Sequence, residues 1–261
     1  MIVDAFDPVS PAIFGPEEVF GARGDLADAC MLTFSLTAYE HAIERFRPKQ
    51  ITVIPALNGD RPIFLLEEEG KRIAFLLCPI TSAGAGACME DAAWMTGAKH
   101  FVVYGSCGSL DASHTEGKLI VPTEAYRDEG FSYHFAPAAD YIKVKNADLV
   151  AGVLSGLGLP CVQGRCWTTD ALYRETRANA TKRRAEGCIA VDMECAGLQA
   201  LCNFRGLEYY TFFYSGDLLD APRWEQRILG NGAEKDHQLS NFLVALEIAK
   251  RVVIEDRRDK R

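Results

Sequence analysis

Residues 102–125 read VVYGSCGSLDASHTEGKLIVPTEA and contain two apolar runs that are separated by glycine and small polar residues. Short runs that are apolar at successive positions are typical of strands buried on both faces. Such strands require helices on both sides of their sheet. The stretch therefore predicts an interior strand that ends in a glycine-containing turn, followed by a second strand.

The same alternation recurs along most of the chain. Further strand-like runs are RIAFLLCPI (72–80), CVQGRCWT (161–168), CIAVDM (188–193) and EYYTFFYSG (208–216). Helical spacing is found in ACMEDAAWMTG (87–97), ADLVAGVLSGLG (147–158), MECAGLQALCNFRG (193–206) and the C-terminal stretch from His237. Glycine near the end of these segments is a common helix terminator. With no repeat, linker or composition break, we predict one α/β domain over residues 1–261 with a mostly parallel or mixed sheet.

Composition excludes several classes of protein. The 261 residues are 48% hydrophobic and 25% charged, with a net charge of -8, which disfavours binding to nucleic acid or anionic lipid. No apolar run is long enough for a membrane span, and the N-terminus is acidic where a signal peptide is basic. Nine scattered cysteines predict reduced thiols in the cytosol. No ligand spacing supports a metal site.

The first candidate site joins residues 79–94, PITSAGAGACMEDAAW, to the Gly105-Ser106-Cys107-Gly108 turn. Glycines after a strand allow a ligand to approach the backbone, and amides at a helix N-terminus attract anions. We therefore expect Gly84, Gly105 and Ser106 to bind phosphate. Tight turns without a ligand are the alternative.

The second candidate site is Val191-Asp192-Met193-Glu194-Cys195-Ala196, where a buried strand ends in two carboxylates before a helix. Ligand contacts in open α/β folds lie at this end of the strands. We expect Glu194 to accept hydrogen bonds from sugar hydroxyls and Met193 to form an apolar wall. Alternatively, both acids cap the helix.

The third candidate site is Tyr214-Ser215-Gly216-Asp217-Leu218. An aspartate that is partly desolvated at the end of a strand can hold a proton near neutral pH and act as a general acid. Alternatively, the sequence Ser-Gly-Asp is typical of an ordinary turn.

Taken in chain order, five motifs resemble those of one enzyme family: G-S-C-G, R-D-E-G-F-S-Y-H-F, W-T-T-D-A-L-Y, V-D-M-E-C-A-G and S-G-D. This is the nucleoside phosphorylase family, which contains purine nucleoside phosphorylases, uridine phosphorylases, and methylthioadenosine and adenosylhomocysteine nucleosidases. The resemblance is strongest over residues 70–255, and residues 1–60 diverge. Five motifs in family order are far more specific than any one of them.

The resemblance implies a mixed, barrel-like sheet flanked by helices, and cleavage of the N-glycosidic bond of a purine or uridine-type nucleoside. Phosphate is then a co-substrate at Ser106 and its glycines, with no other cofactor. Met193 and Glu194 correspond to ribose contacts, and Asp217 to the acid that protonates a departing purine. Contacts to the nucleoside are also expected from Trp167, Thr168, Tyr173 and His134; the alternatives are that Trp167 is a core residue and His134 a structural one. The assembly expected is a homo-oligomer, as a dimer or a trimer of dimers.

Two departures concern the phosphate site. Family phosphorylases carry an N-terminal G-D-P loop followed by an arginine, where this chain reads CMLTFSLTAYEHAI (30–43). They carry a second arginine three residues before the cradle serine, where this chain has Val103. Arg23, Arg127 and Arg174 are candidate replacements.

Three functions remain open from sequence: a phosphorylase, which we favour, a nucleosidase that uses water, and a non-catalytic nucleoside-binding protein. Base identity is also open, because Asp217 is typical of purine-cleaving members while residues 127–135 are closer to the uridine-cleaving branch. Trp94 and Trp224 are expected to be core residues.

Overall fold

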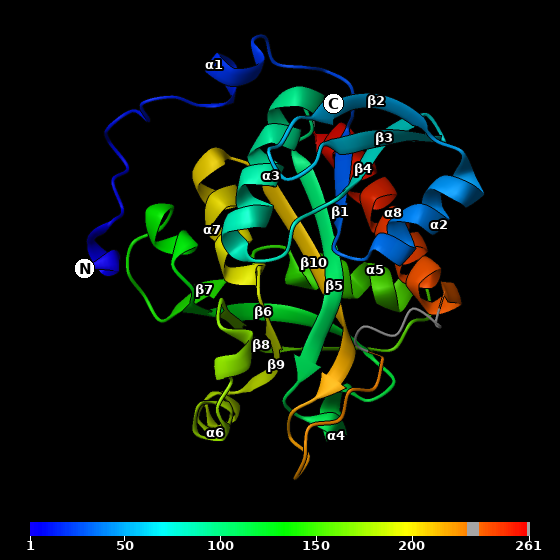
Figure 1. The fold of residues 1–261 in the computed structure, drawn as a ribbon. Helices are drawn as coiled ribbons and strands as arrows, with labels where there is room; N and C mark the ends of the chain where they lie inside the picture. The colour runs from blue at the N-terminus through cyan, green and yellow to red at the C-terminus, as the bar shows by residue number, and fades with distance from the viewer. Residues whose placement is uncertain (229–234, 260–261) are drawn as a thin grey trace.

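The computed structural model describes residues 1–228 and 235–259 (Figure 1). The strands are β1 (Ala29–Thr33), β2 (Lys49–Ile54), β3 (Arg61–Glu68), β4 (Lys71–Leu77), β5 (His100–Ser109), β6 (Leu119–Asp128), β7 (Tyr141–Lys143), β8 (Cys161–Thr169), β9 (Cys188–Asp192) and β10 (Glu208–Leu218). The α-helices are α1 (Pro16–Phe20), α2 (Leu36–Phe46), α3 (Ser82–Thr96), α4 (Ala112–Thr115), α5 (Ala147–Gly156), α6 (Arg177–Ala185), α7 (Cys195–Arg205) and α8 (Lys235–Asp259). Short 3₁₀ helices are η1 (Ile2–Asp4), η2 (Phe131–His134) and η3 (Leu172–Arg174).

The described strands form one mixed sheet. Its order is β10-β6-β8-β9-β5-β1-β4-β3-β2, with β7 paired to β6. An additional pairing of β10 with β5 closes β5, β10, β6, β8 and β9 into a barrel. Both parallel and antiparallel neighbours occur, for example β5 with β10 and β5 with β9. The predicted mixed, barrel-like sheet is confirmed.

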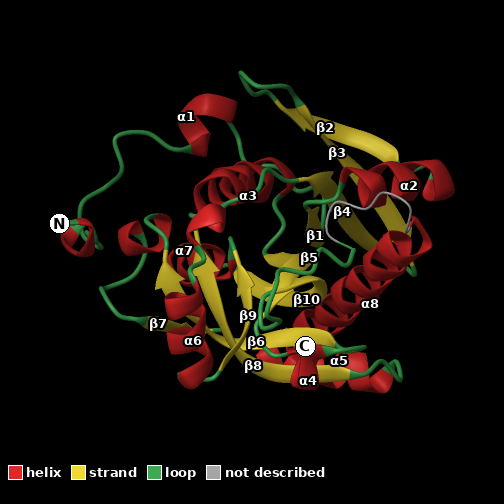
Figure 2. Ribbon diagram, turned by 60° about the horizontal axis from the view of Figure 1, so that its bottom comes forward, coloured by secondary structure: helices red, strands yellow, loops and turns green. Residues whose placement is uncertain are grey.

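Helices cover the sheet on two sides (Figure 2). Helices α3 and α7 pack against each other on one side of β5, and α2 and α8 pack against each other on the other side. Helices α3 and α7 both end at a glycine in the left-handed conformation, Gly97 with φ 76° and Gly206 with φ 66°. Glycine adopts this conformation without the steric cost that a side chain incurs. The predicted helix ends are therefore confirmed there.

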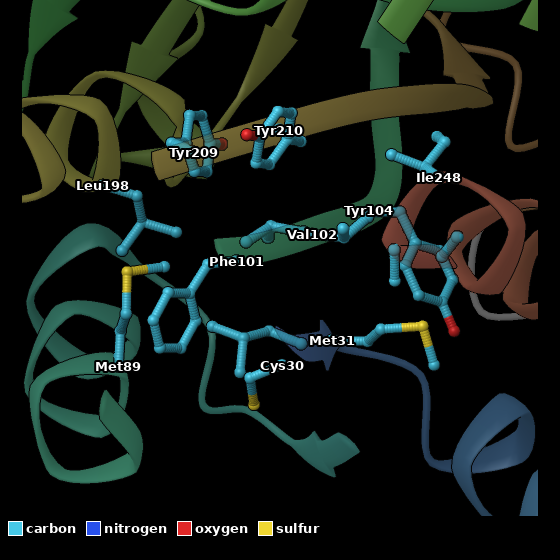
Figure 3. Close-up of a cluster of buried hydrophobic side chains, with 14 of the residues drawn as sticks. Cys30, Met31, Met89, Phe101, Val102, Tyr104, Leu198, Tyr209, Tyr210 and Ile248 are labelled. Carbon is cyan, nitrogen blue, oxygen red and sulfur yellow. The ribbon is translucent and has the colours of Figure 1, made fainter. Parts of the chain in front are cut away.

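The main core lies between β5 and the helices. Figure 3 shows Met89 of α3 and Leu198 of α7 beside Phe101 of β5, and all three are buried. Burying large apolar side chains stabilises a fold by about 1.5 to 3 kcal/mol each. This packing fixes the direction of β5 and therefore the position of the turn that follows it.

The N-terminal region contains two features that the sequence did not reveal. Strand β1 pairs in parallel with both β4 and β5, and β2 and β3 form an antiparallel extension of the sheet. Strand β1 is buried at all five positions, so it belongs to the interior of the sheet. None of the helices in the described part of the chain is both long and apolar enough to cross a membrane.

Candidate active site

The ends of β5, β9 and β10 bring the three predicted sites together. Strands β5 and β10 lie side by side (Figure 1). Tyr214 of β10 is paired with Ser106 of β5, and Asp217 is paired with Gly108. The end of β5 is also joined to β9, where Gly108 is paired with Val191. Segments that are separated by more than 80 residues in sequence therefore meet at one edge of the barrel.

Gly108 is required by this close approach. A Cβ atom on Gly108 would lie 2.3 Å from a methyl group of Leu219, 2.8 Å from Val191 and 3.3 Å from Asp217 Oδ1. Any larger residue would displace these side chains. The second glycine of the G-S-C-G motif thus makes room for the aspartate.

Asp217 is buried, with 8% of its surface exposed, and burial raises the pKa of its carboxyl group. The indole Nε1 of Trp224 donates a hydrogen bond to Asp217 Oδ2 at 2.7 Å, which acts against that increase. Trp224 reaches Asp217 because the chain folds back after β10, where Leu218 and Glu225 form an antiparallel bridge. Asp217 is therefore a desolvated acid that accepts a hydrogen bond from Trp224.

A cavity of about 490 Å³ opens beside Asp217. Its walls are mainly apolar or aromatic, and their residues are Leu172, Tyr173, Glu175, Arg177, Ala180, Asp217, Leu219, Ala221 and Trp224. Burial, together with the charge of Asp217, raises the pKa of Glu175 to about 7. Volumes of this size and this mixture of apolar walls with a few polar groups are typical of small-molecule sites.

Asp192 and Glu194 have different roles. Asp192 is buried and accepts hydrogen bonds from the backbone amides of Glu194 and Cys195, at 3.0 and 2.6 Å, and from Thr168 Oγ1. It is therefore the cap of α7, as the alternative interpretation predicted for both acids. Glu194 makes no such cap bond to α7.

Glu194 faces the start of α3 instead. Its Oε1 accepts a hydrogen bond from the backbone amide of Thr81 at 2.6 Å. Burial and the charge of Asp192 raise the pKa of Glu194 to about 8. A buried carboxyl group with a pKa near neutrality is typical of functional sites, because structure alone rarely needs it.

The start of α3 is tied to Met193. Ser82 Oγ donates a hydrogen bond to the Met193 carbonyl oxygen at 3.1 Å. Thr81, just before it, has φ 76°, a conformation that is costly for a β-branched residue. Backbone strain of this kind is concentrated at functional sites. The two predicted sites at Gly84 and Glu194 are therefore neighbours.

The predicted phosphate cradle has an apolar neighbour. Ser106 is exposed, but a Cβ atom on Gly105 would lie 3.0 Å from the ring of Phe34. Phe34 belongs to the segment that stands in place of the G-D-P loop. Gly84 lies in the first turn of α3, next to Pro79. The Phe34 ring therefore lies against the backbone of the predicted cradle.

None of the interactions found for the three candidate arginines places them at the predicted phosphate site. Arg127 is buried; its guanidinium donates to Ser132 Oγ and to the carbonyl oxygens of Ala136 and Pro137. Arg23 is exposed and lies 6.0 Å from the Trp94 ring, at the opposite end of α3 from Gly84. Arg174 is exposed in η3. None of these interactions connects an arginine to Ser106.

Three residues expected to contact the nucleoside, and one expected in the core, can now be located in the structure. Trp167 and Thr168 are 1% and 0% exposed; they bond to Asp128 and Asp192 and support the site from beneath rather than contacting a nucleoside. Tyr173 is 96% exposed and lines the cavity, consistent with its prediction. Trp224, expected in the core, is 57% exposed and also lines the cavity.

His134 lies in η2 and is exposed. It is not among the residues that line the cavity. Its contact with a sugar remains a prediction.

Sequence reasoning missed Glu175 and the role of Trp224. Glu175 directly precedes Thr176, whose side chain caps α6, and no motif in the sequence marks it. Trp224 follows Pro222 in an irregular segment with no periodicity to indicate which way it faces. Within the described residues, no cluster of three metal-ligating side chains is present.

Comparisons with known proteins agree with this architecture. The family model of the phosphorylase superfamily matches residues 29–250. Curated relatives are matched over 57% to 81% of their own length; a DeoD-type purine nucleoside phosphorylase of Limosilactobacillus reuteri is 25% identical over 200 residues, which is 72% of this chain and 81% of the relative.

Two solved structures share the fold. The purine nucleoside phosphorylase of Toxoplasma gondii in complex with immucillin-H has a TM-score of 0.71 at 18% identity and covers 88% of this chain and 93% of its own. The AMP nucleosidase of Bacteroides thetaiotaomicron has a TM-score of 0.66 at 17% identity, with 89% and 91% covered. The family match over residues 29–250 shows that the chain belongs to the phosphorylase superfamily.

Proposed function

We propose that this chain is an enzyme that cleaves the N-glycosidic bond of a purine nucleoside. The observation that supports this best is Asp217, a buried acid that faces a mainly apolar cavity at the edge of the barrel. Glu194 and Met193, on the neighbouring β9–α7 junction, would hold the sugar. The purine nucleoside phosphorylases among the similar proteins support a purine base.

In the proposed mechanism, the bond between C1′ and the base nitrogen stretches and its electron pair moves onto the base. The Asp217 carboxyl group donates its proton to the imidazole nitrogen of the departing purine. The sugar becomes oxocarbenium-like, and Glu194, bonded to its hydroxyl groups, stabilises the positive charge in its ionised form, whose share rises as pH passes its pKa of about 8. An acceptor oxygen then forms a bond to C1′; when the acceptor is water, its proton is released to solvent or to the Asp217 carboxylate, which restores the acid.

Water is the acceptor that the geometry favours. Charge-assisted hydrogen bonds from arginine are the strong part of a phosphate site, worth roughly 1.5 to 3 kcal/mol each. Here Phe34 lies against Gly105, Arg127 is bonded to backbone carbonyl oxygens, and Arg23 lies beside Trp94. The fold shared with an AMP nucleosidase is consistent with hydrolysis.

Phosphorolysis, the activity favoured from the sequence, is the second candidate. The exposed Ser106 hydroxyl and the start of α3, where Thr81 provides no side-chain cap, both offer donors to an anion. These donors offset less of the desolvation of phosphate than guanidinium groups would.

The acceptor is tested by a panel of nucleosides assayed with and without phosphate. We expect base release without phosphate, free ribose as the product, and a rate that changes less than about threefold in millimolar phosphate, because a weakly bound anion cannot compete with water. Saturation at micromolar phosphate with ribose 1-phosphate as the product would establish phosphorolysis instead.

Replacing Trp224 by Phe tests how Asp217 is tuned. Loss of the indole donor leaves the ionised carboxylate less stable, so the pKa of Asp217 rises. A general acid is active while protonated, so activity then persists to higher pH. We expect the alkaline limb of the kcat/KM profile to move up by roughly one pH unit.

The matched control is Trp94→Phe, whose indole donates to the Gly21 carbonyl oxygen at 2.9 Å, far along α3 from the site. Its pH profile should match the wild type. Identical profiles for Trp224→Phe and Trp94→Phe would show that the Trp224 hydrogen bond does not tune the acid.

We also propose a homo-oligomer and a cytosolic location. Leu57 and Ile80 are exposed apolar side chains, and burying them against a second copy of the chain would be favourable. The nine cysteines are all free thiols, which fits a reducing compartment. Light scattering after size exclusion would measure the assembly.

A further inference from the structure

Thr81, the N-cap residue of α3, has a strained backbone. Its φ of 76° and ψ of 148° lie close to a region that only glycine adopts readily. Three other described non-glycine residues have positive φ, namely Arg47, Glu69 and Arg227, and none of them is branched at Cβ. Branching at Cβ makes a positive φ more costly. The Thr81 side chain makes no cap bond to α3 that would offset this cost.

Contacts on both sides hold Thr81 in this conformation. Its amide donates to Glu194 Oε1 at 2.6 Å, and its carbonyl oxygen accepts from the Ala85 amide at 2.9 Å. Ser82, which follows, is fully buried and donates from Oγ to the β9–α7 junction. Ile80, which precedes Thr81, is 60% exposed. The chain is therefore fixed on the α3 side, and the bond to Glu194 opposes rotation on the Ile80 side.

We propose that Thr81 is a positioning residue whose strained amide holds Glu194 until a sugar hydroxyl group takes the carboxylate. The inference rests on the proposed function, because it assumes that Glu194 binds the sugar. The hydroxyl group and the Thr81 amide compete for the same carboxylate. Losing the amide bond costs less than usual, because an unfavourable backbone conformation can then relax. Part of the strain is therefore recovered as affinity for the sugar.

Glycine at position 81 would give the opposite balance. Glycine adopts a φ of this size without steric cost, so the amide would stay on Glu194. The sugar would then have to displace the amide without any release of strain. The protein without ligand becomes more stable and binds the sugar less tightly, which is a common trade-off between stability and function.

The first experiment measures by calorimetry the binding of formycin B, a C-nucleoside analogue of inosine whose carbon–carbon linkage cannot be cleaved. We expect Thr81→Gly to raise its Kd by about 5- to 100-fold, the range that corresponds to the strain of one such residue. The Kd for free hypoxanthine, which has no sugar, should change by less than about twofold. A Kd for formycin B within about twofold of the wild type would overturn the proposal.

Two further variants separate strain from other effects on binding. Thr81→Ala removes the hydroxyl group but keeps Cβ and most of the strain, so its Kd should stay within about threefold of the wild type. A loss as large as that in Thr81→Gly would instead make the Thr81 hydroxyl group a ligand contact and refute the role of strain. Arg47→Gly is the matched control, because it places glycine at a φ of 46° at the far end of α2 from Phe34. Its Kd should equal that of the wild type.

The second experiment asks whether Glu194 maintains the strain, and it requires no ligand. Thr81→Gly should raise the melting temperature by about 2 to 4 °C, because strain is removed from the folded state. In a Glu194→Ala background Thr81 can relax, so the same change should raise the melting temperature by less than about half as much. Equal gains in both backgrounds would contradict the proposal.

These measurements also separate the inference from the proposed reaction, because neither needs turnover. If nucleosides are cleaved but neither the Kd nor the gain in stability depends on the Thr81–Glu194 pair, the inference about Thr81 fails alone. If no nucleoside is cleaved but formycin B binds and Thr81→Gly has both expected effects, the proposed reaction fails and Thr81 still positions Glu194.

Discussion

Replacing Asp217 by Asn is expected to lower kcat for inosine by about 10²- to 10⁴-fold, the usual contribution of a general acid. Asparagine keeps the shape and can still accept the Trp224 hydrogen bond, but it has no proton to give to the base. Binding of the nucleoside should change far less than turnover. Steady-state kinetics, together with calorimetric Kd values for the same variant, measures both quantities.

The matched control is Asp220→Asn, the same chemical change in the same chain reversal. The Asp220 carboxylate accepts a hydrogen bond from the Ala112 amide at 2.8 Å and does not line the cavity. Its kcat should stay close to the wild type. A kcat for Asp217→Asn within about twofold of the wild type would remove Asp217 from the chemistry.

Replacing Glu194 by Gln is expected to lower kcat/KM by about 10²-fold, with affinity and turnover both affected. A hydroxyl contact that strengthens as the sugar becomes cationic contributes to binding and more strongly to the transition state. Kinetics with inosine and calorimetry with ribose 1-phosphate would separate the two contributions. Unchanged affinity and rate would show that Glu194 is not the sugar contact.

The same substitution should increase stability at pH 8. Because the folded-state pKa of Glu194, about 8, is above its unfolded value, the folded chain binds more protons, and stability falls as pH rises between the two values. Glutamine removes this loss, so we expect Glu194→Gln to gain about 1 kcal/mol or more at pH 8 and nothing near pH 4.

Asp192→Ala is expected to change the free energy of unfolding in the opposite direction to Glu194→Gln. Asp192 accepts two backbone hydrogen bonds at the start of α7, and removing such a cap costs about 1 kcal/mol or more. Melting curves of both variants at several pH values make the comparison. If Glu194→Gln were destabilising at pH 8 like Asp192→Ala, Glu194 would be a structural residue.

The strands of the barrel could be predicted because they are short and mainly apolar runs, several of them apolar on both faces. The runs at 161–168, 188–193 and 208–216 correspond to β8, β9 and β10 within two residues at each end. Their order in the sheet could not be read from the sequence, because the closing contact joins β5 to β10, about 110 residues away. Residues 1–60 were not predicted, since β1 has only five residues and its neighbours mix proline, glycine and charge.

The candidate site was predicted where a residue follows directly from a strand end, as for Asp217 and Glu194. The site was not predicted where the side chain's position depends on how deeply the fold buries it. Trp167 continues strand β8, and the alternation of its side chains placed the indole in the core, bonded to Asp128 at 2.9 Å. Trp224 reaches the site only because the chain reverses after β10. The positions of both tryptophan side chains depend on tertiary contacts that cannot be predicted from the neighbouring residues in the sequence.

The most direct test of the account is to incubate the full chain with inosine, without phosphate, and quantify hypoxanthine and ribose by chromatography. We predict that the two products appear in equal amounts and that Asp217→Asn, examined beside the wild type, releases them far more slowly. Intact inosine after prolonged incubation both with and without phosphate, alongside a melting temperature that rises with inosine, would contradict the account. The protein would then bind nucleosides without cleaving them.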